Sequence, residues 1–343
     1  MLNIHIGRLS ARHARYRSDH AAFDFKDKSF SWKAFDAEIN RLANALLRAG
    51  LQKGDKLATV LSNSLELMIA YWAVAKTGLV IVPCSTLLQA SGLKTLLADS
   101  DSVCVIADAA FAPMLSEIRA DLPAIAPNRW ILAGEALANF QSFEVFTQGA
   151  SEAEPPDAGL DGQDVYNIMY SSGTTGAPKG IVHSHYVRSQ YCSLFAAAWR
   201  MTPESVVLHS GAIVFNGAML DLMPWMFLGC RYILHPSFNP EAVIQDIERY
   251  KVTHMIMVPS QIIALLASPA FAQAEGGPLN EGQIGALVNY MIQAFPQSRL
   301  PGLLHRPQRL ASTEPALKRA VHRRRHVARN GAAGEEADQL VVR

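Results

Sequence analysis

The sequence has few cysteines and almost no excess of charge, and each shortage excludes a class of protein. Its four cysteines are widely spaced among 343 residues, with no C-x-x-C pair and no histidine at metal-ligand spacing. Neither a zinc site nor a disulfide framework is therefore indicated. The 31 basic and 30 acidic side chains leave a net charge of +1, which creates no overall field to attract nucleic acid or anionic lipid. We expect buried reduced thiols, no metal site and no nucleic-acid partner.

Signals for secretion and for membrane insertion are also missing. Charges and histidines interrupt the first residues, where a signal peptide needs a continuous apolar core. The most apolar stretch, residues 206–230, contains His209, Asp221 and Pro224, which are costly or disruptive in hydrocarbon. We expect a buried strand and helix there, no integral membrane segment, and a cytoplasmic protein.

What the sequence does have is apolar residues in an alternating strand and helix pattern. Half of the residues are hydrophobic, which is enough to build the cores of about two domains. Apolar residues at helical spacing predict a helix over residues 33–49, which Gly50 ends. A hairpin is expected over 23–32, strands over 56–61, 79–82 and 102–106, and helices over 65–76 and 91–99. Strands that alternate with helices are typical of an α/β fold with mostly parallel sheets.

A second α/β segment follows an acidic stretch, residues 141–163, that is rich in Pro, Gly and Ser and predicts a surface loop between lobes. Beyond it we expect strands over 165–169, 206–214 and 253–258, and helices over 184–200 and 240–250. The expected division is a first α/β lobe over 1–150, a second over 151–300, and a tail over 301–343. That tail has nine basic and four acidic residues and few large apolar ones, so we expect it to be aberrant and disordered.

The segment Tyr170–Gly180, Tyr-Ser-Ser-Gly-Thr-Thr-Gly-Ala-Pro-Lys-Gly, follows a predicted strand directly. Glycines let successive backbone N–H groups converge on an anion, hydroxyls add donors, and the lysine adds positive charge. These groups predict a cradle for the triphosphate of ATP, formed by Ser171, Ser172, Gly173, Thr174, Thr175, Gly176 and Lys179.

Two other interpretations of this segment are weaker. A Walker loop needs glycine before the lysine and Ser or Thr after it, whereas Pro178 and Gly180 occupy those places. A flexible Ser/Thr/Gly linker would have no need of the preceding strand or of the Pro-Lys-Gly sequence.

The loop resembles the phosphate-binding signature of the adenylate-forming enzymes, which include acyl-CoA synthetases, luciferases and peptide-synthetase adenylation domains. Other stretches are similar to the same family, among them Asn40–Ala43, Ala75–Gly78 and Val258–Ser260, and the resemblance covers about residues 20–300. It implies the layered N-terminal domain of that family, with two α/β lobes of mostly parallel strands and with the small C-terminal domain missing.

The resemblance also implies a two-step reaction. A carboxylate attacks the α-phosphate of ATP to give acyl-AMP and pyrophosphate, with Mg²⁺ sharing the charge, and CoA then takes the acyl group. Residues 171–179 would hold the pyrophosphate, and Phe215, Asn216 and Gly217 would line the acid site, although Phe-Asn-Gly is equally typical of an ordinary turn. The apolar residues 212–226 favour a fatty or aromatic acid. His183 and His185 are interpreted as loop histidines, because two ligands alone make a poor metal site.

The later part of the sequence departs from the family pattern. The family has a Tyr-Gly-x-Thr-Glu stretch, a ribose-binding aspartate, a hinge arginine and a lysine in its C-terminal domain, and no convincing match occurs here. Ser312-Thr313-Glu314 follows Leu310-Ala311 rather than Tyr-Gly. The catalytic residue therefore stays unknown. We expect an impaired acid–thiol ligase; the alternatives are a dead nucleotide-binding fragment, and an acyl-AMP ligase or peptide-synthetase adenylation domain.

A frame shift near Leu300 would explain this departure, because a bias toward Arg, Pro, Ala and His, as in residues 322–326, is typical of translation out of frame. Sequencing the encoding DNA tests this hypothesis. We expect a one-base shift downstream of the codon for Leu300 to restore a Tyr-Gly-x-Thr-Glu reading. If no alternative frame contains it, the tail is genuine; the competing interpretation is then a basic arm for nucleic acid.

Overall fold

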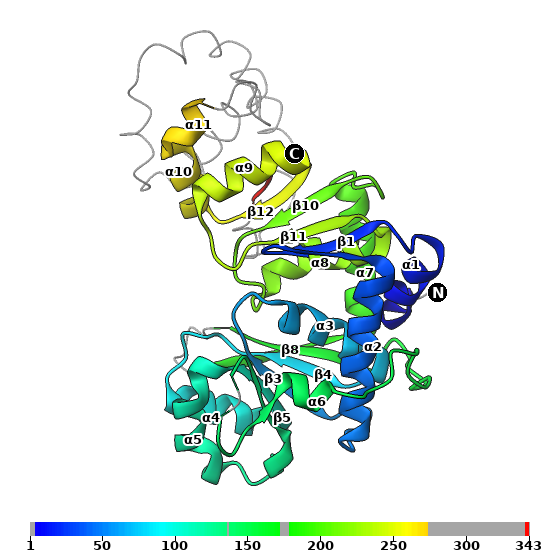
Figure 1. The fold of residues 1–343 in the computed structure, drawn as a ribbon, viewed down its shortest axis with the longest axis vertical. Coiled ribbons are helices and arrows are strands. Elements are labelled where there is room, and N and C mark those ends of the chain that lie inside the picture. The colour runs from blue at the N-terminus through cyan, green and yellow to red at the C-terminus, as the bar shows by residue number, and fades with distance from the viewer. Residues whose placement is uncertain (1–3, 136, 172–177, 274–339, 343) are drawn as a thin grey trace, which may run out of the picture. The chain divides into compact units, whose positions relative to one another are not determined.

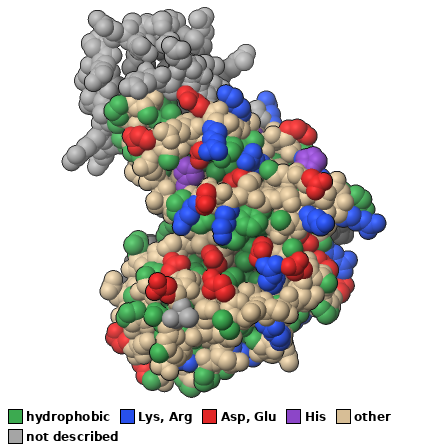
Figure 2. Space-filling view, in the orientation of Figure 1, with side chains coloured by type: hydrophobic (Ala, Val, Ile, Leu, Met, Phe, Trp, Pro, Cys, Tyr) green, Lys and Arg blue, Asp and Glu red, His purple; other side chains and the backbone are tan. Residues whose placement is uncertain are grey.

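The structure, a computed structural model, describes residues 4–135, 137–171, 178–273 and 340–342. The chain divides into two compact units, Met1–Ser237 and Phe238–Arg343. Figure 1 shows strands and helices alternating along the chain, as the sequence predicts. Figure 2 shows acidic and basic side chains intermixed over the face it presents. Across the described residues, no helix combines the length and the apolar character that a bilayer crossing requires.

The first unit contains a seven-stranded sheet in the order β7-β6-β5-β3-β4-β8-β9. Its neighbouring strands are parallel except for the antiparallel pair β8 and β9. The bounds are Lys56–Val60 (β3), Val80–Pro83 (β4), Ser102–Asp108 (β5), Trp130–Ala133 (β6), Gln141–Ser142 (β7), Val165–Ser171 (β8) and Lys179–Ser184 (β9). The central strands β3 and β4 are buried almost throughout, and their sequences, Lys-Leu-Ala-Thr-Val and Val-Ile-Val-Pro, are mostly apolar, as buried parallel strands require.

The same unit contributes β10-β11-β1-β2 to another sheet, with β10, β11 and β1 parallel and β1 antiparallel to β2. These strands are Ala21–Phe25 (β1), Lys28–Ser31 (β2), Val206–His209 (β10) and Arg231–Leu234 (β11). The helices are Leu9–Tyr16 (α1), Trp32–Arg48 (α2), Leu65–Thr77 (α3), Ala90–Asp99 (α4), Ala112–Ile118 (α5), Phe143–Thr147 (α6), His185–Ala198 (α7) and Met219–Leu228 (α8), with five short 3-10 turns.

Local sequence explains where the main helices begin and end. Serines at the N-caps of α2, α3 and α7 each accept a hydrogen bond from a backbone N–H in the first turn. At the end of α3, Gly78 takes a left-handed φ of 75°, a conformation that other residues adopt at a cost. Helix α3 is apolar on every side, and its residues from Leu67 to Thr77 are all buried, as such a helix requires.

The second unit, by itself, contains Pro240–Tyr250 (α9), His254–Met257 (β12), Pro259–Ala267 (α10), Pro269–Gln273 (α11) and Leu340–Val342 (β13). Asn239 caps α9 and accepts from the N–H of Ala242, while Val243, Ile244 and Ile247 are its buried face. Strand β13 is antiparallel to β12. Residues 340–342 were expected to be disordered. They form a strand because Leu-Val-Val has a high strand propensity and pairs with the apolar strand β12. The rest of that tail prediction lies outside the described residues.

The structure confirms the helices predicted over 33–49, 65–76, 91–99, 184–200 and 240–250, each within two residues. It differs over 206–214, where β10 ends at His209, and over 141–163, which includes β7 and α6. It also does not divide at 150/151. Strand β8 pairs with β4 and β9 pairs with β8, which places both in the first sheet, while β1 pairs with β11 of the other. Parallel strands are joined by long crossovers, so segments distant in the sequence can become neighbours in one sheet.

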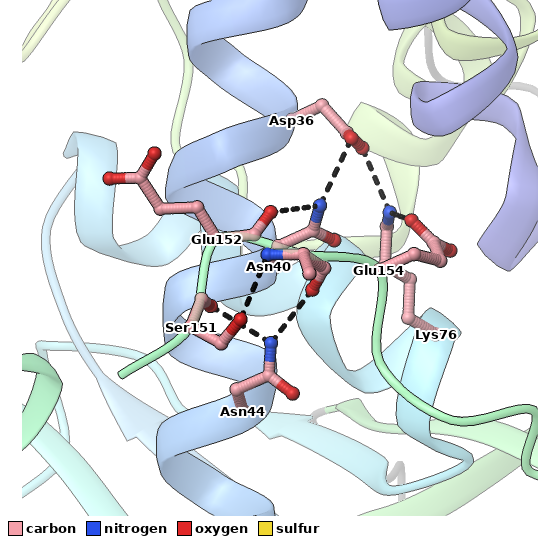
Figure 3. Close-up of polar contacts among 8 residues, drawn as sticks. Asp36, Asn40, Asn44, Lys76, Ser151, Glu152 and Glu154 are labelled. Carbon is pink, nitrogen blue, oxygen red and sulfur yellow. Dashed lines mark hydrogen bonds and ion pairs between the residues drawn. The ribbon is translucent and has the colours of Figure 1, made fainter. Parts of the chain in front are cut away.

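The acidic segment after α6 is fastened to α2 rather than loose, and we call residues 148–154 the strap (Figure 3). Arg48 donates to the carbonyl of Gln148 at 3.1 Å. Asn44 donates to the carbonyls of Ser151 and Ala153, each at 2.9 Å. Polar side chains one helical turn apart therefore bind successive carbonyls of an irregular chain, so its backbone groups are satisfied without a sheet.

A buried lysine, Lys76, binds the strap at its last residue, Glu154 (Figure 3). The ammonium of Lys76 lies 2.8 Å from Asp36 and 2.5 Å from Glu154, and only 1% of its side chain is exposed. Asn40 joins the cluster by donating to Asp36 at 3.1 Å and to the carbonyl of Glu152 at 3.0 Å. Two carboxylates thus compensate the desolvation of this charge, and the amide of Asn40 donates to one of them.

Replacing Lys76 by methionine removes the cation and leaves Asp36 buried without its partner. We expect the free energy of unfolding to fall by about 3–5 kcal/mol, the usual cost of breaking a buried pair, measured by urea denaturation. The matched control is Lys94→Met, because Lys94 is 43% exposed and pairs with an exposed Asp121; it should cost less than about 1 kcal/mol. Equal losses in the two variants would contradict a buried role for Lys76.

Candidate functional site

The predicted phosphate cradle connects the antiparallel strands β8 and β9. Ser171 ends β8, Lys179 begins β9, and the two residues are register partners. Both are exposed. Ser172, Gly173, Thr174, Thr175 and Gly176 lie outside the described residues. The structure therefore brings together the two ends of the predicted cradle, a hydroxyl and an ammonium group on facing strands.

The topology places this loop where α/β sheets bind ligands. Strand β8 is parallel to β4, which is parallel to β3, so Ser171 lies at the carboxyl end of the sheet. In open α/β sheets ligands bind outside that end. Phe215 and Asn216 likewise follow the carboxyl end of β10. Both predicted groups of site residues therefore come from the side of their sheets that is suited to binding.

Gly180 is needed for packing beneath the loop. It faces Tyr170 in the register of β8 and β9. A β-carbon at position 180 would lie 3.0 Å from Ile168 and 3.1 Å from the ring of Tyr170. The hydroxyl of Tyr170 donates to Asp99 at 2.5 Å, and burial, followed by this bond, raises the pKa of Tyr170. The glycine thus lets the ring lie across β9 and reach α4.

Asn63, which the sequence analysis did not identify, holds the segment after β10. Its amide donates to the carbonyls of Gly211 at 2.6 Å and His235 at 2.9 Å, and accepts from the N–H of Ile213 at 3.0 Å. Tyr71 adds a hydrogen bond to the carbonyl of Ile213 at 2.8 Å. Because Asn63 follows β3, these bonds join the carboxyl end of one sheet to the loops of the other.

The predicted acid wall follows this anchored segment. Phe215 is 49% exposed, and Asn216 and Gly217 begin the 3-10 turn η5, Asn216–Ala218, which leads into α8. An exposed large aromatic beside half-buried polar residues is suited to contact with a ligand. The role of these three residues in acid binding stays a prediction.

Arg188 connects this wall to β8 and was also missed by the sequence analysis. Its Nε donates to Oδ1 of Asn167 at 2.8 Å, and its Nη2 donates to Oδ1 of Asn216 at 2.9 Å. A signal was present, because Arg188 lies at helical spacing from the buried His185 and Cys192. A charged residue on the core face of a helix is uncommon enough to mark a site.

His183 and His185 are not loop histidines, contrary to expectation. His183 lies within β9, and His185 is the first residue of α7. Burial lowers the pKa of each to about 4, so both are neutral near pH 7. His183 lies 3.3 Å from the amide of Asn167, and His185 packs edge-on against Tyr166. Strand β9 begins at Lys179, so regular structure begins earlier after the loop than the glycine-rich sequence predicted.

The family described as AMP-binding enzyme matches residues 10–323. The chain is 30% identical over 250 residues to a long-chain-fatty-acid–CoA ligase, FadD13, of Mycobacterium tuberculosis, and 28% identical over 249 residues to a crotonobetaine/carnitine–CoA ligase of Salmonella paratyphi B. These alignments cover 73% and 71% of this chain but 48% of each relative. The chain thus spans about half their length.

A solved structure supports the same relationship. The inhibitor-bound N-terminal domain of FACL13 from Mycobacterium tuberculosis is similar with a TM-score of 0.71 and 26% identity, over 84% of this chain and 74% of that one. The resemblance and the layered α/β architecture expected from the sequence are confirmed. The family match also includes residues 301–323, which composition alone assigned to an aberrant tail.

Adding a methyl group at Gly180 should displace Tyr170 from its bond to Asp99. We expect Gly180→Ala to lower the free energy of unfolding by about 1–3 kcal/mol, the usual range for overpacking, measured by urea denaturation. Gly92→Ala is the matched control, since its nearest contact would be an ordinary 3.6 Å to Leu88 and Gly92 lies within α4; it should stabilise by about 0.5–1 kcal/mol. A neutral Gly180→Ala would contradict the packing argument.

Proposed function

The chain belongs to the AMP-binding enzyme family, and we propose that it takes part in the ATP-dependent activation of a carboxylic acid to acyl-AMP and then to acyl-CoA. Its curated relatives are acid–CoA ligases. The observation that carries the proposal is the pairing of Ser171 with Lys179 at the carboxyl end of β8. An ammonium group and a hydroxyl at that position suit the phosphates of a nucleotide.

In the first step, an oxygen of the substrate carboxylate forms a bond to the α-phosphorus, and the bond to the bridging oxygen breaks. Pyrophosphate leaves with the electron pair. Lys179 would neutralise charge on the departing group, and Ser171 would donate a hydrogen bond to it. Such reactions depend on positioning and on charge stabilisation rather than on covalent help from the protein.

In the second step, a thiol attacks the acyl carbon and AMP leaves. Phe215, Asn216 and Gly217 would hold the acid, and the apolar residues around them favour a fatty or aromatic chain. Coenzyme A is the acceptor that the relatives' names imply. The cytoplasm is the compartment we propose for this reaction.

Magnesium would enter with the nucleotide. Within the part of the chain that the structure describes, no group of three or more His, Cys, Asp or Glu side chains is placed to hold a metal ion. Magnesium that comes with a nucleotide is usually held by the phosphates, waters and one or two carboxylates.

A nucleotide-binding chain without turnover is the second candidate. It is favoured by the residues that the family matches, 10–323, which include no convincing match to the Tyr-Gly-x-Thr-Glu stretch that the family resemblance implies. An acyl-AMP ligase or a peptide-synthetase adenylation domain would share the first step and differ in the acceptor. The inactive chain and the ligase therefore differ in turnover, not in nucleotide binding.

Replacing Lys179 by alanine should weaken MgATP binding about 10–100-fold, because a charge-assisted contact to phosphate is lost. Titration calorimetry measures this, with Lys33→Ala, at an exposed position of α2, as the unchanged control. Pyrophosphate exchange with a panel of carboxylic acids then separates the two candidates. Exchange supports the ligase, and binding without exchange supports the inactive chain. A wild-type protein with no affinity for MgATP overturns both.

A further inference from the structure

Arg188 is a completely buried cation at the proposed acid site. Its relative exposure is 0%, and its Nε and Nη2 are bound by the neutral oxygens of Asn167 and Asn216. Its Nη1 is buried and has no hydrogen-bond partner among the described residues. The ring of Tyr191 lies 5.0 Å from the guanidinium carbon. Burial lowers the pKa of the guanidinium, and the tyrosines 191, 166 and 71 partly oppose that effect.

A buried charge normally has an opposite charge beside it, because desolvation costs several kcal/mol. Lys76, which is equally buried, has two carboxylates within 2.8 Å. No ion pair found within the described ranges includes Arg188. The polar groups near the guanidinium in the described residues are the amides of Asn167 and Asn216, the phenols of Tyr191, Tyr166 and Tyr71, the sulfur of Met169 and the neutral His183, none of which carries a negative charge. The cluster is therefore a cationic site that lacks an anion.

The described end of the phosphate cradle, Ser171, lies apart from Arg188 along β8. Arg188 binds Asn167, which lies four residues before Ser171 on the same strand. That separation is about 13 Å along an extended chain, and the cradle begins only at Ser171. Arg188 instead contacts Asn216, which is half-buried and belongs to the proposed acid wall. The guanidinium is thus positioned toward the acyl part of the substrate.

We propose that Arg188 binds a second anionic group at the far end of the substrate, so that the preferred acids are dicarboxylic acids rather than simple fatty acids. This inference rests on the proposed function, because it takes Asn216 as part of the acid site. The same charge would repel a quaternary ammonium acid, such as the one named for the Salmonella relative. Nε and Nη2 of Arg188 already donate to Asn167, Asn216 and the sulfur of Met169, so the unpaired Nη1 is the nitrogen that would donate a charge-assisted hydrogen bond to the distal carboxylate.

The test compares acids of equal length that differ only in the distal charge. Pyrophosphate release is measured with glutarate, adipate and suberate, and with the monomethyl ester of each. We expect kcat/KM to be at least about tenfold higher for the preferred diacid than for its ester. Arg188→Met should remove that preference by lowering the diacid value about 100-fold, while the ester value changes less than about threefold. Arg188→Lys, which keeps the charge without the planar fork, should give an intermediate preference.

Gln190→Met, at an exposed position of the same helix, is the control and should leave the preference unchanged. Equal use of diacid and ester by the wild type overturns the subsite, as does an equal loss for both substrates in a folded Arg188→Met, which would make Arg188 a structural cross-link. Calorimetry of wild-type protein with the diacid and with its ester keeps the test independent of turnover and of variant folding. Failure of MgATP binding would refute the proposed function, whereas MgATP binding without diacid preference refutes only this inference.

Discussion

The complete burial of helix α3 is the constraint on which the first unit depends. Its sequence is apolar on every side, so the helix is stable only when other elements cover all of it. Of the polar side chains buried with it, two bind segments that are distant in the chain. Lys76 binds Asp36 and Glu154, which fixes the strap, and Tyr71 binds the carbonyl of Ile213, which fixes the segment after β10. The requirements of one helix therefore organise segments far apart in the chain.

The candidate site is built from polar groups at the edge of this core. Asn63 has all three of its described bonds directed to the backbone of the segments after β10 and β11. Asn167 and Arg188 form the corresponding link between β8 and η5. Buried amides are satisfied only in one arrangement of their neighbours, so these links hold Ser171, Phe215 and Asn216 on a rigid frame. The loop that would meet the phosphates is carried by this frame at its two ends.

The two buried cations, Lys76 and Arg188, have opposite electrostatic surroundings. Lys76 is surrounded by carboxylates and is explained fully by structure. Arg188 is surrounded by neutral oxygens, aromatic rings and a thioether. Because the desolvation of a guanidinium is offset only in part by neutral acceptors, the second arrangement is best explained by a ligand. Under the proposal for Arg188, that contrast is the physical basis of substrate selectivity.

The amino-acid sequence by itself determined the local elements and the chemistry of the loop. Apolar spacing predicted α2, α3 and α9, and the residues from Ser171 to Lys179 indicated a phosphate cradle, because helix periodicity and anion binding by glycine-rich loops are local properties. Only the tertiary structure decided which strands share a sheet, that β8 lies between β4 and β9, and that His183 and His185 belong to regular elements. It alone identified Asn63, Asn167 and Arg188, since a polar residue acquires a role through partners that are distant in the chain, and no local pattern encodes such pairings.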